Sequence, residues 1–234
     1  TATPSLANSF APEIYTGNST ARTISTGFAT DFVWIKSRDV ARNHYLYDSI
    51  RGANNQLLTN AGSGEVNVGE RLTAFDSNGF DIGTSGEVNN TNEKYVAWNW
   101  KAGGTPSINT DGTLNSIVSA NQAAGFSVVS YSGNSTSGAT VGHGLGAAPD
   151  LVIIKSYNAT SNWIIYSSPT GNGKYLQFNI GAASSSNWFN TSATTFTLNN
   201  TFGDANASSR NYIAYNFTSI SGYSKVGTYS GTAS

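Results

Sequence analysis

The sequence predicts an all-β protein built from two tandem, sequence-related antiparallel β-sandwich units of the jelly-roll or lectin-like kind. Short runs of β-branched and aromatic residues recur about every eight to twelve residues, with Gly, Asn and Ser turns between them. No helical period of apolar residues is sustained over about ten positions. The chain also repeats itself, because residues 15–37 (YTGNST…DFVWIKS) return as residues 131–156 (YSGNST…DLVIIKS).

Matching blocks of the two repeats keep nearly the same spacing along the chain. The offset is 131 − 15 = 116 for the first tyrosine, 150 − 31 = 119 for an aspartate and 212 − 95 = 117 for the tyrosine of the last strand. A near-constant register over half a chain indicates duplication rather than shared composition. Each unit has roughly 100 residues, a usual size for a sandwich. One concanavalin-like sandwich formed by both repeats is the alternative that the sequence leaves open.

The repeats divide the chain into five predicted parts. A small polar arm covers residues 1–9, the first repeat covers 10–101, a connection covers 102–124 and the second repeat covers 125–221. The connection is rich in Gly, Ser, Thr and Asn, and we expect it to be partly strand, with a hairpin turn at Asp111-Gly112. Residues 222–234 resemble the opening of the second repeat, so they predict the first strand of a third copy, cut short at Ser234.

In the first repeat, the clearest expected strand is 31–36. Its residues Phe32 to Ile35 are all apolar, which favours a strand covered on both faces. The strand at 95–100 alternates, which places Trp98 and Trp100 on one face. Residues 63–71 carry the main charge cluster and are expected to form a short helix or a loop. The other expected strands are 10–15, 23–25, 44–48, 56–59, and a hairpin of 72–75 with 79–83.

The second repeat shows the same order of strands. They are expected at 126–131, 139–141, 151–155, 163–166, 175–179, 195–198 and 212–217.

Composition limits the function classes. The formal net charge is −1 and charged residues make up 11% of the chain, so nothing steers the protein toward nucleic acid or an anionic membrane. The absence of Cys excludes disulfides and thiolate metal sites. No run of about 18 apolar residues is present, so we expect no membrane insertion.

The residues predict no catalytic, cofactor or metal site. The chain has no Gly-x-Ser-x-Gly motif. Asp31 and Asp150 occupy equivalent positions at the start of the same strand in the two repeats, which indicates turn or backbone partners rather than a pair of glycosidase carboxylates. We expect structural roles for His44 and His143, and two histidines without Cys do not make a usual zinc site.

Five tryptophans leave one candidate binding function. Trp and Tyr rings can stack on sugars, although core packing is the commoner use of such residues. Trp34 lies in an all-apolar strand, and Trp98 and Trp100 align with Tyr215 and Phe217, so we expect these three in the core. By contrast, the sequence places Trp163 and Trp188 among Asn and Ser, and we predict that these two form an exposed platform for glycans.

Several ordered blocks resemble a repeat domain of tailed, notably marine, bacteriophages. The blocks are TGFATDFVWIKSRD, HYLYDSIRG, LTAFDSNGFDIG, YVAWNWKAGG and the run from SANQAAGF to LVIIKS, and the resemblance covers residues 10–234. In that family the domain occurs in tail-fibre and virion structural proteins, often beside laminin-G-like modules. The departures lie in 184–191 and 199–209, which are more polar than the family pattern. The family supplies no catalytic residues.

The resemblance implies a non-enzymatic virion structural protein, either a tail fibre, an appendage or a head-surface protein, that contributes to host attachment. It implies a place on the virion surface, contacts with other virion proteins and with copies of itself as a homo-oligomer, and contact with host surface glycans. The alternative is a carbohydrate-binding, lectin-like module. A third and weaker alternative is a polysaccharide depolymerase, which the lack of paired carboxylates disfavours.

Overall fold

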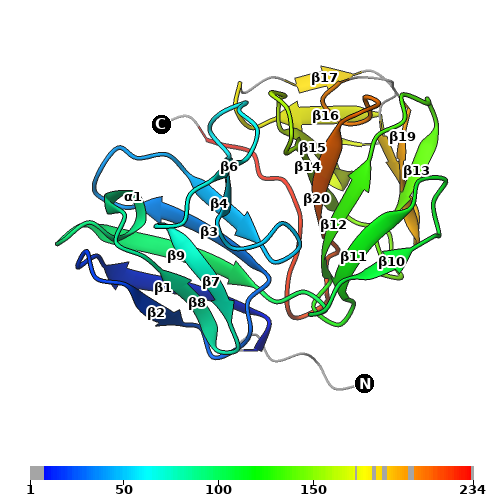
Figure 1. The fold of residues 1–234 in the computed structure, drawn as a ribbon. Coiled ribbons are helices and arrows are strands. Elements are labelled where there is room, and N and C mark those ends of the chain that lie inside the picture. The colour runs from blue at the N-terminus through cyan, green and yellow to red at the C-terminus, as the bar shows by residue number, and fades with distance from the viewer. Residues whose placement is uncertain (1–7, 172, 181–182, 186–188, 200–202, 233–234) are drawn as a thin grey trace.

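The structure is a computed structural model that describes residues 8–171, 173–180, 183–185, 189–199 and 203–232. It confirms the all-β class: the described residues form four antiparallel sheets, and the named helical elements are α1 (Gly86–Asn89) and a 3-10 turn at Ser168–Thr170. Figure 1 shows the first half of the chain on one side of the molecule and the second half on the other.

The first half contains one six-stranded sheet and one three-stranded sheet. The six-stranded sheet has the order β1-β9-β3-β4-β5-β6 and the small sheet has the order β2-β8-β7. Their strands are β1 (Phe10–Thr16), β2 (Arg22–Ser25), β3 (Phe32–Ser37), β4 (Tyr45–Asp48), β5 (Asn55–Leu58), β6 (Val66–Asn67), β7 (Leu72–Asp76), β8 (Gly79–Ile82) and β9 (Lys94–Trp100).

The second half contains one eight-stranded sheet and another three-stranded sheet. The large sheet has the order β10-β11-β12-β20-β14-β15-β16-β17 and the small sheet has the order β13-β19-β18. Their strands are β10 (Ser107–Asn109), β11 (Ser116–Asn121), β12 (Phe126–Ser132), β13 (Ala139–Gly142), β14 (Leu151–Ser156), β15 (Ile164–Ser167), β16 (Lys174–Gln177), β17 (Ala183–Ser185), β18 (Phe189–Thr191), β19 (Thr195–Leu198) and β20 (Asn211–Phe217).

Three apolar clusters hold the sheets together as four layers. One cluster lies between the six-stranded sheet and its small sheet, and a second lies between the eight-stranded sheet and its small sheet. The third contains residues of both large sheets, so the two sandwiches pack back to back through the outer faces of these sheets. Because this third cluster buries large aromatic and aliphatic side chains of both large sheets, it holds the two halves together.

Strand β3 shows how the layers follow from the sequence. Val33 and Ile35 point into the first sandwich core, and Phe32 and Trp34 point toward the second sandwich. A strand between two apolar layers needs apolar residues on both faces, as its sequence predicted.

The two large sheets use corresponding strands in the same order and register. The order β1-β9-β3-β4-β5 of the first half corresponds to β12-β20-β14-β15-β16 of the second. Tyr15 lies opposite Tyr95 between β1 and β9, and Tyr131 lies opposite Tyr212 between β12 and β20.

The structure refines one expectation and corrects another. Residues 63–71, expected as a short helix or a loop, form a loop that contains the two-residue strand β6, which pairs with β5. The helical turn α1 falls just after Ser85, whose side chain accepts a hydrogen bond from the Glu87 N–H and so caps it. Residues 222–232, expected as an opening strand, join no sheet in the described chain; Ser224 forms an isolated bridge with Ile220 instead.

Candidate functional site

An aromatic cleft lies between the outer faces of the two large sheets. It encloses about 330 Å³, near the lower end of the volumes of small-molecule sites, roughly 300–1,000 Å³. Aromatic and aliphatic side chains of both sheets make up most of its wall, and a segment near the C-terminus closes one side. The lining residues are Phe32, Trp34, Trp100, Ala124, Gly125, Phe126, Leu151, Ile153, Phe178, Phe217, Thr218, Tyr223, Ser224, Lys225 and Val226.

The cleft rings form two groups of contacting aromatics. In one group Trp34 meets Phe178 at 6.1 Å between ring centroids, and outside the cleft it meets Trp98 edge-on at 5.8 Å. In the other group Trp100 meets Phe217 edge-on at 5.8 Å. All three tryptophans are only partly buried, so the face of strand β9 that carries Trp98 and Trp100 is less enclosed than a core face.

Three polar atoms of cleft residues are buried without a hydrogen-bond partner. They are the indole Nε1 of Trp34 and the hydroxyls of Thr218 and Tyr223. A buried donor left unpaired costs about 1–3 kcal/mol, so buried polar groups normally find partners. Hydroxyl or carbonyl groups of a ligand in the cleft can supply the missing partners.

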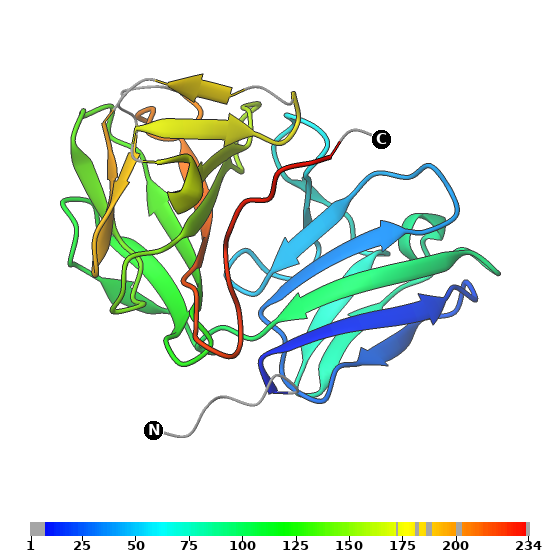
Figure 2. The same cartoon turned by 180° about the vertical axis from the view of Figure 1, so that it is seen from behind.

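A strap closes the cleft on one side, and we define it as residues 219–226. Most of its backbone bonds are local: Ser224 N–H donates to Ile220 C=O at 2.9 Å, and Val226 N–H donates to the Ser219 hydroxyl at 3.0 Å. Its first residue is anchored to the second half, because Ser219 N–H donates to Asp150 at 2.8 Å. Figure 2 shows this C-terminal segment running over the junction of the two halves. The strap belongs to no sheet, so its side chains form a wall of the cleft outside the sheet pairing.

Trp163, predicted as an exposed glycan platform, lies instead deep in the interface between the sandwiches. Its side chain is fully buried, and its Nε1 donates to the carbonyls of Leu58 at 2.8 Å and Ala61 at 3.1 Å. The polar neighbours in its sequence misled the prediction, because the loop after β5 covers the indole from the other half of the chain. Trp188, the second predicted platform residue, lies outside the described residues.

The same side of the interface contains a buried ammonium group. The Nζ of Lys155 donates to the Ser161 hydroxyl at 2.9 Å, to Ser156 C=O at 2.9 Å and to Gly62 C=O of the first half at 3.2 Å. Burial lowers the pKa of Lys155 to about 8. Its bonds to oxygen atoms of both halves indicate a role in joining the sandwiches.

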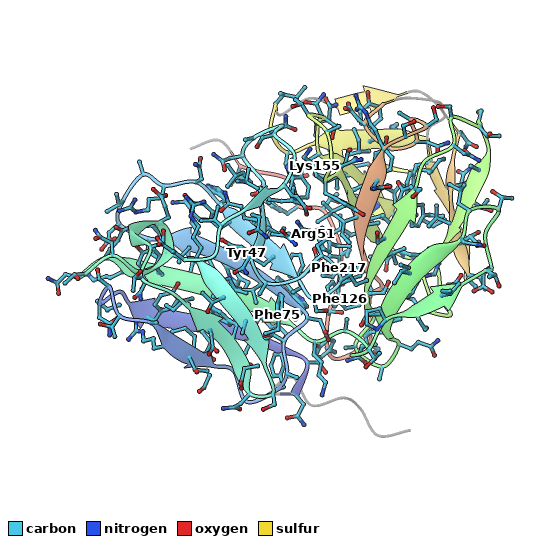
Figure 3. All side chains as sticks on the ribbon, in the orientation of Figure 1. Tyr47, Arg51, Phe75, Phe126, Lys155 and Phe217 are labelled. Atoms are coloured by element: carbon cyan, nitrogen blue, oxygen red, sulfur yellow. The ribbon has the colours of Figure 1, made fainter. Side chains whose placement is uncertain are left out.

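A network of buried charges lies between Lys155 and the cleft. Arg51 Nε and Asp48 Oδ2 are 2.6 Å apart, and Arg51 Nη1 also approaches Glu65 Oε2 at 3.1 Å. The Tyr215 hydroxyl donates to the same Asp48 oxygen at 2.7 Å. Figure 3 shows Arg51, Lys155, Phe126 and Phe217 at the junction of the halves. The charges of this network are paired with one another, which is typical of a structural cluster.

A family described as Domain of unknown function (DUF7483) matches residues 6–234. The chain belongs to this family. No curated protein and no solved structure matches it.

The two aspartates expected as backbone partners have that role in the DUF7483 chain. Asp31 accepts hydrogen bonds from the Ser49 hydroxyl at 2.8 Å and from Ala102 N–H at 2.8 Å. Asp150 accepts from the Ser168 hydroxyl at 2.8 Å and from Ser219 N–H at 2.8 Å. Burial raises the pKa of Asp31, whereas for Asp150 the bonds from Ser219 and Ser168 outweigh burial and lower the pKa.

His143 is fully buried and makes two backbone contacts. Its Nδ1 accepts from Leu145 N–H at 3.2 Å, and its Nε2 lies 3.2 Å from Ser192 C=O. Burial lowers the pKa of His143, which keeps the imidazole neutral with Nε2 as the donor. This agrees with the predicted structural role. His44 is half-buried, and burial also lowers its pKa. The described part of this DUF7483 domain contains no cluster of three potential metal ligands.

No helix of the described chain is long and apolar enough to span a membrane.

The cleft tryptophans of this DUF7483 domain, Trp34 and Trp100, were expected in the core but are only partly buried. A usable signal exists in strand β9, where Ala97 and Asn99 are fully buried while Trp98 and Trp100 face the other way. Small residues on the core face leave the bulky ring face for contacts beyond the sandwich. The sequence showed that the two faces of β9 alternate. It did not show which of the two faces packs on the sandwich core.

Proposed function

We propose that this chain is a non-enzymatic structural protein of a bacteriophage particle, in a tail fibre, an appendage or the head surface, and that it contributes to attachment to the host surface. The resemblance of its ordered blocks to phage virion proteins supports this role. Its low charge and its mutually paired buried ions suit a stable module that presents a surface.

We also propose that the chain consists of two tandem copies of one sandwich unit. Equivalent side chains make equivalent bonds: Tyr15 OH donates to Val88 C=O and Tyr131 OH donates to Ala205 C=O, both at 2.8 Å. Each of these tyrosines stacks on its cross-strand partner at 5.2 Å between ring centroids. Shared strand order, shared register and shared polar contacts together support duplication better than chance similarity of composition.

The observation that carries the attachment role is the aromatic cleft. It combines partly exposed indole rings with three unpartnered polar atoms, and its lining contains no Asp or Glu. Such a site can bind a ligand through apolar contact and hydrogen bonds. Because no carboxylate lines it, the wall of this cleft offers no acid and base of the kind that glycoside hydrolysis uses.

We propose that copies of the chain act together as a homo-oligomer on the particle, around a symmetry axis of three or more, where they also contact other virion proteins. Ile108 and Ile117 lie opposite each other on β10 and β11 and are 75% and 47% exposed. This apolar pair at the end of the large sheet supports contact with a neighbouring copy. Several weak sites on one particle can gain about 10²–10⁴ in apparent affinity.

The test of the proposed function is to find the chain on its particle. Antibodies against the purified chain are expected to label a regular position on the virion surface and to reduce adsorption to host cells. The matched control is antibody absorbed with an excess of the purified chain. If labelled virions show no surface signal, or if adsorption stays unchanged while the surface is saturated with antibody, the attachment role is wrong.

A carbohydrate-binding module is the second candidate, and the cleft is the specific observation that favours it. In this reading the binding residues are the cleft rings rather than Trp163, which is buried. Purified chain would then bind host polysaccharide without other virion proteins. Release of reducing sugar from that polysaccharide by the purified chain would instead indicate a depolymerase.

A further inference from the structure

We propose that the aromatic cleft binds one neutral pyranose ring, held between the indoles of Trp34 and Trp100 and the strap residue Tyr223. The proposal deepens the attachment role, on which it rests for its biological meaning, by naming a ligand class and its contacts.

The shape and chemistry of the walls favour a sugar ring. A pyranose has one face of C–H bonds, which carry small positive charge and pack against the electron-rich face of an aromatic ring. The cleft offers such rings from three directions, because Trp34 and Trp100 belong to the first sandwich, Phe126 and Phe217 to the second, and Tyr223 to the strap. Its volume of about 330 Å³ suits a single ring better than a long chain.

The unpartnered polar atoms identify where ligand hydroxyls would bind. The indole N–H of Trp34 can only donate, whereas the hydroxyls of Thr218 and Tyr223 can both donate and accept. A sugar hydroxyl can satisfy any of the three, because it also donates and accepts. A purely apolar ligand would leave all three atoms unpaired, at the cost that buried polar groups normally avoid.

The charges around the cleft favour a neutral ring. Lys225 is the one charged residue among the lining residues, and its side chain lies on the exposed strap. An acidic sugar or a phosphate would lose hydration inside the cleft with only that exposed ammonium to compensate. A neutral ring carries no charge whose hydration would be lost on binding, and it makes the same stacking and hydroxyl contacts.

The experiment measures binding by isothermal titration calorimetry, which does not depend on the tryptophans as reporters. Methyl β-D-glucopyranoside and methyl β-D-galactopyranoside serve as neutral probes, and D-glucuronate serves as the acidic probe. We expect saturable binding of at least one neutral probe and at least tenfold weaker binding of glucuronate. Binding of neither neutral probe, or tighter binding of glucuronate, would overturn the proposal.

Variants locate the site. Trp34→Phe keeps a ring but removes the indole donor, and we expect it to weaken neutral-sugar binding about tenfold. Tyr223→Ala removes the strap ring and is expected to weaken binding by a similar factor. Tyr229→Ala is the matched control, because Tyr229 is in the same C-terminal segment but is 94% exposed and outside the cleft lining. Circular dichroism and thermal melting confirm that each variant is folded.

The outcomes separate this proposal from the attachment role. If neutral sugars bind equally well to wild type, Trp34→Phe and Tyr223→Ala, the cleft is not the site, whatever the antibody experiment shows. If Trp34→Phe does not fold, the comparison of Tyr223→Ala with Tyr229→Ala decides alone, since the strap belongs to no sheet. A third outcome is that the cleft binds sugar but antibodies do not find the chain on the virion. That outcome would support the sugar site and refute the attachment role.

Discussion

The hydroxyl of Tyr215 donates a 2.7 Å hydrogen bond to the carboxylate of Asp48, which lies 167 residues earlier in the chain and in the other sandwich. The same Asp48 oxygen also pairs with Arg51. Tyr215 and Asp48 are both fully buried, so the hydrogen bond between them fixes the relative position of the two large sheets at the centre of their interface.

Removing the Asp48 carboxylate should therefore destabilise the whole chain. In Asp48→Ala the buried Arg51 guanidinium loses its closest counter-charge, and breaking one side of such a pair costs about 3–5 kcal/mol. Tyr215→Phe should cost less, about 1.5–3 kcal/mol, because it removes one hydrogen bond to a charged group. Urea unfolding gives both values, and Tyr229→Phe, at a 94% exposed position, is the neutral control. Equal stability of Asp48→Ala and wild type would contradict this account.

Truncating Trp163 should lower the free energy of unfolding more than truncating Trp34. This order is the reverse of the one that the sequence predicted, with Trp34 in the core and Trp163 exposed. Trp163→Ala removes a fully buried ring with two hydrogen bonds, and large aromatics removed from a core cost about 3–5 kcal/mol. Trp34→Ala removes a partly exposed ring at the cleft, for which we expect about 1–3 kcal/mol. Thermal and chemical unfolding of the two variants side by side test the order. A larger loss in Trp34→Ala would show that its ring belongs to the core after all.

Acid should weaken the first sandwich through one ion pair. Hydrogen bonds from Arg42, at 2.6 and 2.8 Å, lower the pKa of Glu93 to about 2. A carboxyl whose folded pKa lies below its unfolded value contributes stability above the unfolded pKa, near 4.5, and loses it as the pH falls toward 2. The difference in unfolding free energy between wild type and Glu93→Gln is expected to shrink over this window. Glu70→Gln, at an exposed position, should show no such change with pH.

The apolar pair on the β10–β11 hairpin should control self-association. Ile108→Asp places a charge at a 75% exposed position and should shift the oligomer toward monomer without lowering the melting temperature. Thr110→Asp, at an exposed position beside the same hairpin, is the matched control for the added charge. Light scattering coupled to gel filtration measures the mass. The proposed assembly through this hairpin is wrong if wild type is monomeric at every concentration, or if Ile108→Asp assembles as well as wild type.

Much of the fold could be predicted because strands depend on local features. Alternating or continuous apolar residues and Gly, Asn and Ser turns located most strands of both halves, including the hairpin of β10 and β11 within residues 102–124. The apolar run of β3 also indicated correctly that this strand is covered on both faces. These features act over a few residues, so sequence alone can reveal them.

The functional surface depended on contacts between residues far apart in the chain. Trp163 is surrounded by polar residues in the sequence, yet the backbone around Leu58 and Ala61 encloses it from the other sandwich. Trp34 lies in an apolar run, yet the outer faces of the large sheets do not close around it and leave a cleft. The sequence alone determined which residues form strands and which strand faces are apolar. Only the tertiary structure decided which apolar face is buried and which lines a site, because burial depends on what packs against a face rather than on the residues within it.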